Sequence, residues 1–486
     1  QSSMQSAMSD KKQRILDLYP DTQFIFYDDI DDALIGVVTR FGQEPIICYD
    51  YYRCLAIYQE RDGMTHEEAV EHFEFNVIGG YVGPNTPCFL QKDGSEWTMH
   101  SIYPSKVMAE PPRVLIGGKD CKHPYSASIL NISAMSYGSM SKNAIMALNK
   151  GAQGGGFYHN TGEGSVSDYH RMGGDLVYQI GTGYFGCRGE DGNFSAEKFV
   201  KSAAIETVKM IEIKLSQGAK PGHGGMLPAA KNTEEIARVR GIKPWTDVHS
   251  PSAHTAFNSP EGLLKFVAQL RELSGGKPIG FKLCIGNTKE FEAICDAMIT
   301  SGIMPDFITV DGAEGGTGAA PIVFSDHVGM PWENALVFVV KTLRNYGLKK
   351  DIKVITSGKI IDGFDIYKAL CLGADLCNSA RAMMLAIGCI QALECHKNTC
   401  PTGVATNNPN LFRGLVVEDK WKRVMNYQQS TVKDFLEVFS AAGCTQLSDL
   451  NSDMIFKQVN GKAVSFSNIY PELVESRRAK ELELMN

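Results

Sequence analysis

Residues 277–312 read KPIGFKLCIGNTKEFEAICDAMITSGIMPDFITVDG, and this stretch decides the fold class. Its two ends, 277–283 and 306–312, are short apolar segments typical of buried strands, and residues 288–301 between them have the apolar spacing of a helix. A strand, a helix and a second strand in this order predict two parallel strands joined by a crossover helix. The stretch therefore indicates an α/β fold with a parallel sheet.

The same alternation continues on both sides of this stretch. Helical periodicity also lies at 260–273, 332–346 and 363–372. Eight strand–helix units between residues 128 and 400 predict a closed (β/α)8 TIM barrel rather than an open sheet. No G-x-G-x-x-G motif follows the first strand, which disfavours a Rossmann dinucleotide site. The candidate barrel strands are 128–135, 155–161, 209–215, 245–250, 277–283, 306–312, 352–358 and 374–380.

The barrel leaves segments at both ends of the chain. The N-terminal segment has short apolar stretches at 23–29 and 45–50 that predict strands. It also has Thr65 three residues before Glu68, which is the capping-box spacing of a helix start. These signals predict a small α+β module. The expected division is 1–9 as a disordered tail, 10–90 as this module of unknown role, 91–127 as a linker wrapping the barrel, 128–400 as the barrel, and 401–486 as a C-terminal loop and helical extension that caps it.

The composition is that of an ordinary globular protein. The chain has 486 residues, of which 43% are hydrophobic and 21% charged, so it has ample apolar material for a core. Its net charge of -7 argues against a general nucleic-acid surface, and no apolar run reaches the roughly 18 residues that a membrane helix needs. Thirteen cysteines spread over so long a chain do not resemble a disulfide scaffold. We therefore expect a protein of the cytoplasm or another reducing compartment, with no membrane span and no nucleic-acid partner.

Glycine-rich segments follow several candidate strands, at the end where a barrel places its active site. Residues 311–321 after the sixth strand read DGAEGGTGAAP, and glycines let backbone N–H groups approach an oxyanion closely. Phosphate sites in this fold typically lie after the seventh and eighth strands, here at 357–359 and 379–381. Together with Lys282 on the fifth strand, these loops predict a phosphorylated cofactor such as FMN.

Three cysteines lie close together in the segment CIQALECHKNTC at 389–400. The spacing Cys389-x5-Cys395-x4-Cys400 does not match structural zinc, which usually has four ligands with closely paired cysteines. His396 would be strained as a fourth ligand because it is adjacent to Cys395. Thiolates also hold iron–sulfur clusters, and three of them suit a cluster that lacks one iron corner. Three unrelated core cysteines remain an alternative.

Several motifs occur in the same order as in the FMN-binding synthase domain of glutamate synthases. They are SAMSYGSMS, NTGEG, SQGAKPGHGG, GFKLCIG, DGAEGGTGAAP, SGKI and GCIQALECHKNTCPTGVAT. Over about residues 97–450 the chain resembles this family, in particular its stand-alone members without a glutaminase domain. The resemblance implies a [3Fe-4S] cluster on Cys389, Cys395 and Cys400. The FMN contacts that it implies are Met135, Ser136, Thr161, Gln217, Lys282, Asp311, Gly315, Gly316, Thr317, Ser357, Gly358, Lys359, Ser379, Ala380 and Arg381.

The resemblance also implies a reaction. Electrons enter at the cluster and pass to FMN, and a hydride then reduces 2-iminoglutarate, formed from 2-oxoglutarate and ammonia, or a related imino acid. Lys282 is expected to stabilise negative charge on the flavin or the substrate, and Glu163 to orient the imine or relay a proton. Gln217 and Lys220 are expected to contact the flavin ring and the substrate. The implied partners are a ferredoxin or a reductase subunit as electron donor, free ammonia or a separate glutaminase, and a second copy of the chain in a homo-oligomer.

Some positions depart from the family's motifs and leave the substrate open. Tyr184 in GYFG replaces an arginine, with Arg188 as a candidate to restore the charge, and His223 replaces an acid. His254 and Thr255 lie where the family has PPHHD. One alternative is a cofactor-binding scaffold or regulatory protein without turnover. Another is a different FMN or nucleotide barrel, such as a relative of inosine monophosphate dehydrogenase or type 2 isopentenyl diphosphate isomerase, although the three cysteines argue against it.

Overall fold

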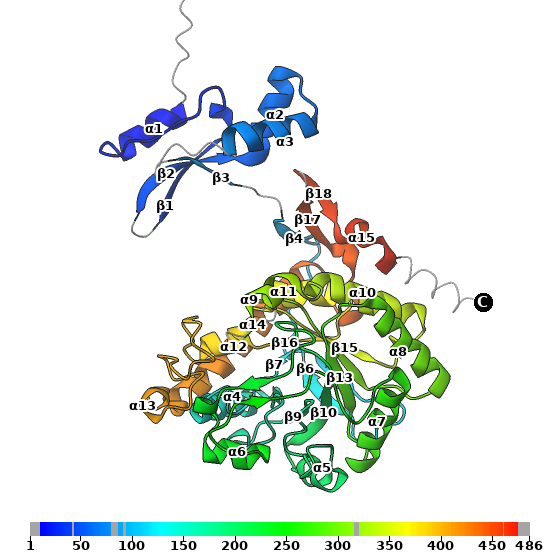
Figure 1. The fold of residues 1–486 in the computed structure, drawn as a ribbon. Coiled ribbons are helices and arrows are strands. Elements are labelled where there is room, and N and C mark those ends of the chain that lie inside the picture. The colour runs from blue at the N-terminus through cyan, green and yellow to red at the C-terminus, as the bar shows by residue number, and fades with distance from the viewer. Residues whose placement is uncertain are drawn as a thin grey trace, which may run out of the picture. The chain divides into compact units, whose positions relative to one another are not determined.

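The computed structural model divides the chain into two compact units (Figure 1). The first unit contains Gln1–Thr98 and Phe456–Phe466, and the second contains Met99–Ile455 and Ser467–Asn486. The tail predicted at 1–9 lies outside the described residues. The structure describes residues 10–40, 43–78, 86–90, 94–314, 320–459 and 461–474.

The second unit contains a closed barrel of eight parallel strands, which confirms the predicted (β/α)8 fold (Figure 1). Each strand pairs with its neighbours in chain order, and β16 closes the ring on β7. Every residue of β13 and β14 is buried, as expected for strands that are covered by helices outside and packed inside. The barrel strands are β7 (Leu130–Ile132), β8 (His159–Asn160), β9 (Leu176–Ile180), β10 (Val208–Lys214), β13 (Ile279–Leu283), β14 (Phe307–Asp311), β15 (Lys353–Ser357) and β16 (Leu376–Ser379).

The sequence prediction misplaces one barrel strand. The third strand is β9, which the prediction lacks because only loops and a short 3-10 helix, η3 (Asp168–His170), precede it, so it does not follow an amphipathic helix. The segment 245–250, predicted as the fourth strand, lies outside the barrel. Its residues Val248–His249 form β12, which pairs antiparallel with β11 (Met226–Leu227) in a two-stranded sheet. The other seven predicted segments each overlap a barrel strand.

Helices surround the barrel where the apolar periodicity predicts them. α7 begins after its N-cap Ser259, whose side chain accepts a backbone hydrogen bond, and Pro260 occupies its first turn. Across the described ranges, no helix has the length and apolar character that crossing a membrane requires. The predicted helices are confirmed as α7 (Pro260–Leu273), α8 (Thr288–Ser301), α10 (Trp332–Asn345) and α11 (Gly363–Cys371). The others are α4 (Lys142–Gly155), α5 (Ala196–Ala203), α6 (Glu234–Arg240), α9 (Ile322–His327), α12 (Arg381–Ala386), α13 (Pro409–Phe412), α14 (Val417–Ala441) and α15 (Phe466–Ile469).

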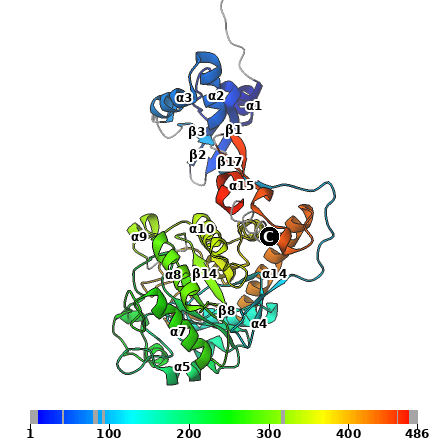
Figure 2. The same ribbon diagram turned by 90° about the vertical axis from the view of Figure 1, so that its right-hand side faces the viewer.

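The long helix α14 packs against α4 on the outside of the barrel (Figure 2). A Cβ at Gly151 of α4 would lie 2.7 Å from the Val424 side chain, and one at Gly154 would lie 3.1 Å from the Trp421 ring. Two small residues one helical turn apart on α4 therefore allow the close approach of α14. α14 accounts for the helix expected in the C-terminal segment.

Other parts of the flanking segments differ from expectation. Residues expected in the helical extension form a hairpin, β17 (Ile455–Val459) and β18 (Lys462–Ser465), which forms a three-stranded sheet with β4 (Glu96–Thr98). The expected linker contains β5 (Arg113–Ile116) and β6 (Tyr125–Ser128), which pair antiparallel. Pairing partners this far apart in the chain, as between β4 and β17, leave no local signal in the sequence.

The first unit also contains an α+β arrangement with its own core. Ile47, Tyr49 and Phe73 belong to its buried apolar cluster. The predicted capping box is confirmed, because the Thr65 side chain accepts from Glu68 N–H and the Glu68 carboxylate accepts from Thr65 N–H. The strand predicted at 23–29 is wrong, since this segment packs its phenylalanines on the cluster without strand pairing. The elements are α1 (Asp10–Leu18), β1 (Leu34–Arg40), β2 (Gln43–Asp50), α2 (Tyr51–Asp62), α3 (His66–Phe73) and β3 (Cys88–Leu90).

Two fully buried histidines predict that the barrel is sensitive to acid. The ring centroids of His159 and His170 lie 5.3 Å apart, and both nitrogens of His159 lack a hydrogen-bond partner among the described residues. Burial lowers the pKa of His159 well below 6.5 and that of His170 to about 3. The unfolded chain therefore binds more protons below pH 6.5, so the free energy of unfolding falls as the pH falls, by about 1.4 kcal/mol per pH unit for each histidine.

Chemical denaturation of the protein between pH 7 and 4 measures this slope. The variant His159→Leu should have a shallower slope, whereas His123→Gln, at an exposed position, should keep the wild-type slope. Equal slopes in all three proteins would mean that the buried imidazoles do not control acid unfolding.

Candidate active site

The ends of the barrel strands surround a cavity of about 290 Å³. Its walls come from loops after several strands, which is the arrangement expected at the C-terminal face of a barrel. Of the residues singled out in the sequence, those that line it are Met135, Ser136, Glu163, Gln217, Lys220, Lys282, Ala380, Arg381, Cys389, Cys395 and Cys400.

A smaller cavity of about 100 Å³ shares part of this lining. It adds Asp311 from the end of β14, Ser357 from the end of β15, and residues 358–359, which follow β15. Lys359 and Arg381 bring two cationic side chains to it. Lys282 also lines this cavity, as do the acids Asp311 and Glu314, so the loops after the seventh and eighth strands meet in one small space in which three cations accompany two carboxyl groups.

Lys282 lies between the two cavities and is held by an acid from the next strand. Its Nζ lies 3.6 Å from Asp311 Oδ2, and both side chains are almost fully buried. Asp311 also accepts hydrogen bonds from the Ser357 hydroxyl at 2.6 Å and from Gly218 N–H at 2.9 Å. Two neighbouring strands and the loop after β10 thereby fix the position of a lysine on β13.

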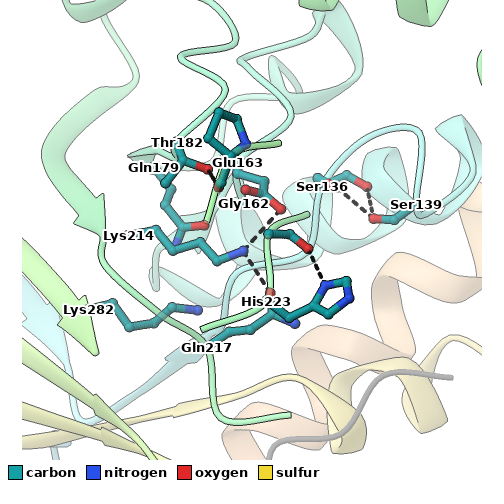
Figure 3. Close-up of polar contacts among 12 residues, drawn as sticks. Ser136, Ser139, Gly162, Glu163, Gln179, Thr182, Lys214, Gln217, His223 and Lys282 are labelled. Carbon is teal, nitrogen blue, oxygen red and sulfur yellow. Dashed lines mark hydrogen bonds and ion pairs between the residues drawn. The ribbon is translucent and has the colours of Figure 1, made fainter. Parts of the chain in front are cut away.

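Glu163 lines the larger cavity and forms an ion pair with Lys214, which was not predicted from the sequence. Lys214 at the end of β10 places its Nζ 3.0 Å from Glu163 Oε1 and also donates to Gln217 Oε1 at 2.7 Å (Figure 3). Burial alone would raise the pKa of Glu163, but Lys214 and the nearby charges of Arg240 and Lys220 lower it below its ordinary value. Glu163 is therefore a carboxylate at neutral pH.

A second buried acid lies among the strands and has all its partners there. Glu212 on β10 accepts hydrogen bonds from Asn160, Gln179 and Thr309, at 2.7–2.8 Å. Gln179, from the strand that the prediction lacks, also lines the cavity. Had β9 been recognised, its alternate inward positions would have identified Gln179.

Two of the predicted cofactor contacts lie outside both cavities, and three residues in or near the larger cavity were not predicted from the sequence. Thr161 and Ser379 line neither cavity; their hydroxyls donate to the backbone oxygens of Gly162 and Ile360. Predicted cofactor contacts at 315–317 lie outside the described residues. The missed residues are Lys214, Lys231 and Arg240.

The three clustered cysteines face the same cavity as Glu163 and Lys282. Burial alone would raise the pKa of the Cys400 thiol, but backbone N–H groups of Ala405, Thr402 and Val404, together with the Thr402 hydroxyl, lower it below its ordinary value. In the part of the chain that the structure describes, no three His, Cys, Asp or Glu side chains are close enough to hold a metal ion. The geometry thus brings the thiols to one wall of the cavity, and the hydrogen bonds around Cys400 favour its thiolate.

Lys231 holds the cysteine segment in place through hydrogen bonds to backbone carbonyl oxygens. Its buried ammonium donates to the carbonyl oxygens of Ser139, Cys395 and Ala405 at 2.6–3.1 Å. Burial lowers the pKa of Lys231 to about 8. The side chain therefore joins the loop after the first barrel strand to the cysteine segment at Cys395 and to Ala405, five residues beyond that segment.

Tyr184 and His254, two positions that depart from the family's motifs, do not line the cavity and form hydrogen bonds outside it. Tyr184 is fully buried, accepts from Ala256 N–H at 3.0 Å and lies 3.1 Å from His254 Nδ1. His254 Nε2 lies 2.9 Å from the Lys214 carbonyl, which can only accept, so Nε2 carries the hydrogen and Nδ1 accepts from the tyrosine hydroxyl. Burial lowers the pKa of His254, which is consistent with this neutral form.

The remaining departures do not bring charge to the cavity either. Arg188 donates to the carbonyls of Gly183 and Gly192, so it does not restore the missing cation. His223 is exposed and lies against its own loop, with Nδ1 3.0 Å from the Gly224 carbonyl (Figure 3). The Thr255 hydroxyl donates to Asn193.

Comparison with known proteins assigns the chain to a family. The conserved region in glutamate synthase matches residues 110–445. The glutamate synthase large subunit-like protein YerD of Bacillus subtilis is 42% identical over 364 residues, covering 74% of this chain and 69% of YerD. The archaeal glutamate synthase [NADPH] of Methanocaldococcus jannaschii is 36% identical over 324 residues, covering 66% of this chain and 60% of the relative. Among solved structures, a mandelate oxidase variant with benzaldehyde has 13% identity and a TM-score of 0.45, covering 76% of this chain and 86% of that chain. By the extent of the conserved region and the identity to YerD, this chain belongs to the glutamate synthase family.

Proposed function

We propose that this chain is a glutamate synthase-like oxidoreductase that binds FMN and a [3Fe-4S] cluster and reduces 2-iminoglutarate, formed from 2-oxoglutarate and ammonia, to glutamate. The observation that carries the proposal is one connected lining. Glu163, Gln217, Lys220 and Lys282 share the larger cavity with the cysteine segment, and Lys282 and Gln217 also line the smaller one.

The chemistry of the lining fits FMN. Lys359 and Arg381 suit a phosphate in the smaller cavity, as expected after the last two strands of this fold. Lys282 would stabilise negative charge on the flavin ring, and its bond to Asp311 holds it in place. Gln217, oriented by Lys214, would contact the ring. Lys282 lies on one barrel strand and the other three donors follow three different strands, so the folded barrel assembles them.

The cysteine segment supports the cluster proposal. Cys389, Cys395 and Cys400 line the same cavity, and the lowered pKa of Cys400 favours the thiolate that iron requires. When bound, the cluster would admit electrons and the flavin would supply hydride to the imine carbon. Glu163, ionised and exposed to the cavity, would accept or return a proton at its carboxylate during imine formation and reduction.

The proposal leaves the supply of electrons and ammonia to partners. We propose a ferredoxin or a reductase subunit as electron donor, and free ammonia or a separate glutaminase chain as nitrogen source. A homo-oligomer in the cytoplasm or another reducing compartment is part of the same proposal.

Cofactor analysis of cysteine variants tests the proposal. The purified protein should have a flavin spectrum and about three iron atoms per chain. The variants Cys389→Ser, Cys395→Ser and Cys400→Ser should each lose most of the iron and its electron-spin signal while they retain flavin. The control Cys121→Ser replaces a half-buried cysteine outside both cavities and should retain both cofactors. Equal iron content in all four variants would rule out the three cysteines as ligands.

Turnover tests the reaction. Chemically reduced protein mixed with 2-oxoglutarate and ammonium should be reoxidised and form glutamate. Protein that contains both cofactors and remains reduced would contradict the proposed substrate and favour the scaffold or another imino acid.

A further inference from the structure

Lys231 is a buried cation that forms no ion pair with an Asp or Glu in the described part of the chain. The residue is 2% exposed, and its ammonium donates to the carbonyl oxygens of Ser139, Cys395 and Ala405. Carbonyl oxygens carry only a partial charge, and a buried charge is costly unless an opposite charge accompanies it. A negative group close by would offset that cost.

The clustered thiols are the groups near this ammonium that can become negative. The Nζ of Lys231 lies 2.9 Å from the carbonyl oxygen of Cys395 itself. When they are deprotonated, Cys395 and Cys400 attract the ammonium, whereas the nearby Arg240 repels it. Cysteines bind metal as thiolates. A metal group on these cysteines would therefore give Lys231 the counter-charge that it lacks among the described residues.

The backbone next to Lys231 is also bonded to the cysteine segment and to the turn after it. Lys231 is the last residue of a 3-10 helix, η4 (Ala229–Lys231). Asn398 Nδ2 donates to the Ala230 carbonyl at 3.0 Å, and Asn407 Nδ2 donates to the Lys231 carbonyl at 3.0 Å. Neither bond involves the ammonium group. The charge at position 231 can therefore be changed while these two bonds still hold η4 beside the cysteines.

We propose that Lys231 supplies a fixed positive charge that favours the reduced form of the proposed [3Fe-4S] cluster and so raises its reduction potential. This inference rests on the proposed function, since it assumes that Cys389, Cys395 and Cys400 hold the cluster. Each electron that arrives from the donor protein makes the group of cluster and thiolates more negative by one charge. Net charge and hydrogen bonding around an iron–sulfur cluster are among the factors that set its potential.

Lys231 is in this account a positioning residue, because it acts through the cysteines and not on the substrate. It lines neither of the two cavities. Its charge should therefore affect the potential of the cluster much more than that of the flavin. This difference separates an electrostatic role from a general loosening of the site, which would disturb both groups.

Potentiometric titration of the full chain with both cofactors tests the assignment without turnover. Dithionite is the reductant, the electron-spin signal reports the cluster, and the visible spectrum reports the flavin. Lys231→Met keeps the length of the side chain and removes its charge. It should make the cluster about tenfold or more harder to reduce, a shift of about 59 mV or more to lower potential for one electron. The flavin midpoint in the same sample should change much less.

Two further substitutions separate the charge from the hydrogen bonds. Lys231→Arg keeps the charge and should restore most of the wild-type potential, whereas Lys231→Gln keeps N–H donors without the charge and should lower the potential as Lys231→Met does. If Lys231→Met loses its iron, these two variants make the same comparison with donors retained. The matched control is Lys277→Met, because the half-buried Lys277 ammonium also donates to two backbone carbonyls but lies outside both cavities. It should leave the cluster potential unchanged.

Iron content and potential together separate failure of this inference from failure of the proposed function. Wild-type protein that contains flavin but no iron would end the cluster proposal and this inference with it. If iron is present and the cluster midpoint of Lys231→Gln equals or exceeds that of the wild type, the charge does not favour the reduced form. The inference is then overturned, while the proposed function stands. Equal shifts of the cluster and the flavin midpoints would also overturn it.

Discussion

Replacing Glu163 with glutamine is expected to lower the rate of glutamate formation by about 10²–10⁴-fold while flavin remains bound. The carboxylate lies in the cavity, paired with Lys214 at 3.0 Å, and its pKa is lowered, so it is ionised at neutral pH. Glutamine has nearly the same size but cannot accept the proton. Single-turnover reoxidation of the reduced protein by 2-oxoglutarate and ammonium measures the effect.

The pH dependence of the wild-type rate gives a second readout. Since the ionised form of Glu163 is stabilised, the acidic limb that it controls should lie below pH 4.5, the ordinary value for glutamate. The control Glu333→Gln breaks a similar Lys–Glu pair at 2.8 Å between α10 and α11, away from both cavities, and should leave the rate near that of the wild type. A full rate in Glu163→Gln would show that the carboxylate only neutralises Lys214.

Replacing Gly218 with alanine is expected to destabilise the protein by about 1–3 kcal/mol and to release the flavin. Gly218 follows β10, and a Cβ there would lie 1.8 Å from the Gly312 carbonyl oxygen, which follows β14. Backbone atoms cannot move aside as a side-chain end can, so the two loops must separate. Their separation would break the bond from Gly218 N–H to Asp311 and leave Lys282 without its fixed partner.

Denaturant unfolding and flavin titration of the variant measure both effects. Gly286→Ala is the matched control, because that glycine follows β13 at the same end of the barrel and a Cβ there would meet no atom within 4 Å. It should bind flavin normally and unfold at or slightly above the wild-type midpoint. Normal flavin affinity in Gly218→Ala would mean that the two loops do not approach each other as closely as the structure has them.

Much of the barrel could be predicted because its second half is regular. From residue 260 onward each apolar strand alternates with an amphipathic helix, so the period of the apolar residues alone defines the elements. β9 was not predicted because the chain between β8 and β9 forms loops and one short 3-10 helix, so no amphipathic helix marks the start of this unit. The hairpin of β17 and β18 was not predicted because β4, the third strand of its sheet, lies more than three hundred residues earlier in the chain.

In the candidate site, too, residues at predictable strand ends were found and residues brought together only by the folded chain were not. Lys282 and the loop at 357–359 were found because a strand end in a barrel is a position that sequence can define. Lys214 also ends a strand, but nothing in the sequence shows that its partner is Glu163, fifty-one residues earlier. Arg240 reaches the cavity from the end of helix α6. The sequence of a helix predicts which of its faces is buried, but not which loop that face contacts.

The three carbonyls that surround Lys231 have a mechanical consequence. Ser139 lies more than two hundred and fifty residues before Cys395 and Ala405 in the chain, yet a single ammonium group holds all three carbonyl oxygens. A displacement of the cysteine segment would therefore either break these bonds or pull the loop that carries Ser136 with it. Ser136 lines the larger cavity, so the wall that carries the thiols and the wall that carries Ser136 are constrained to shift together.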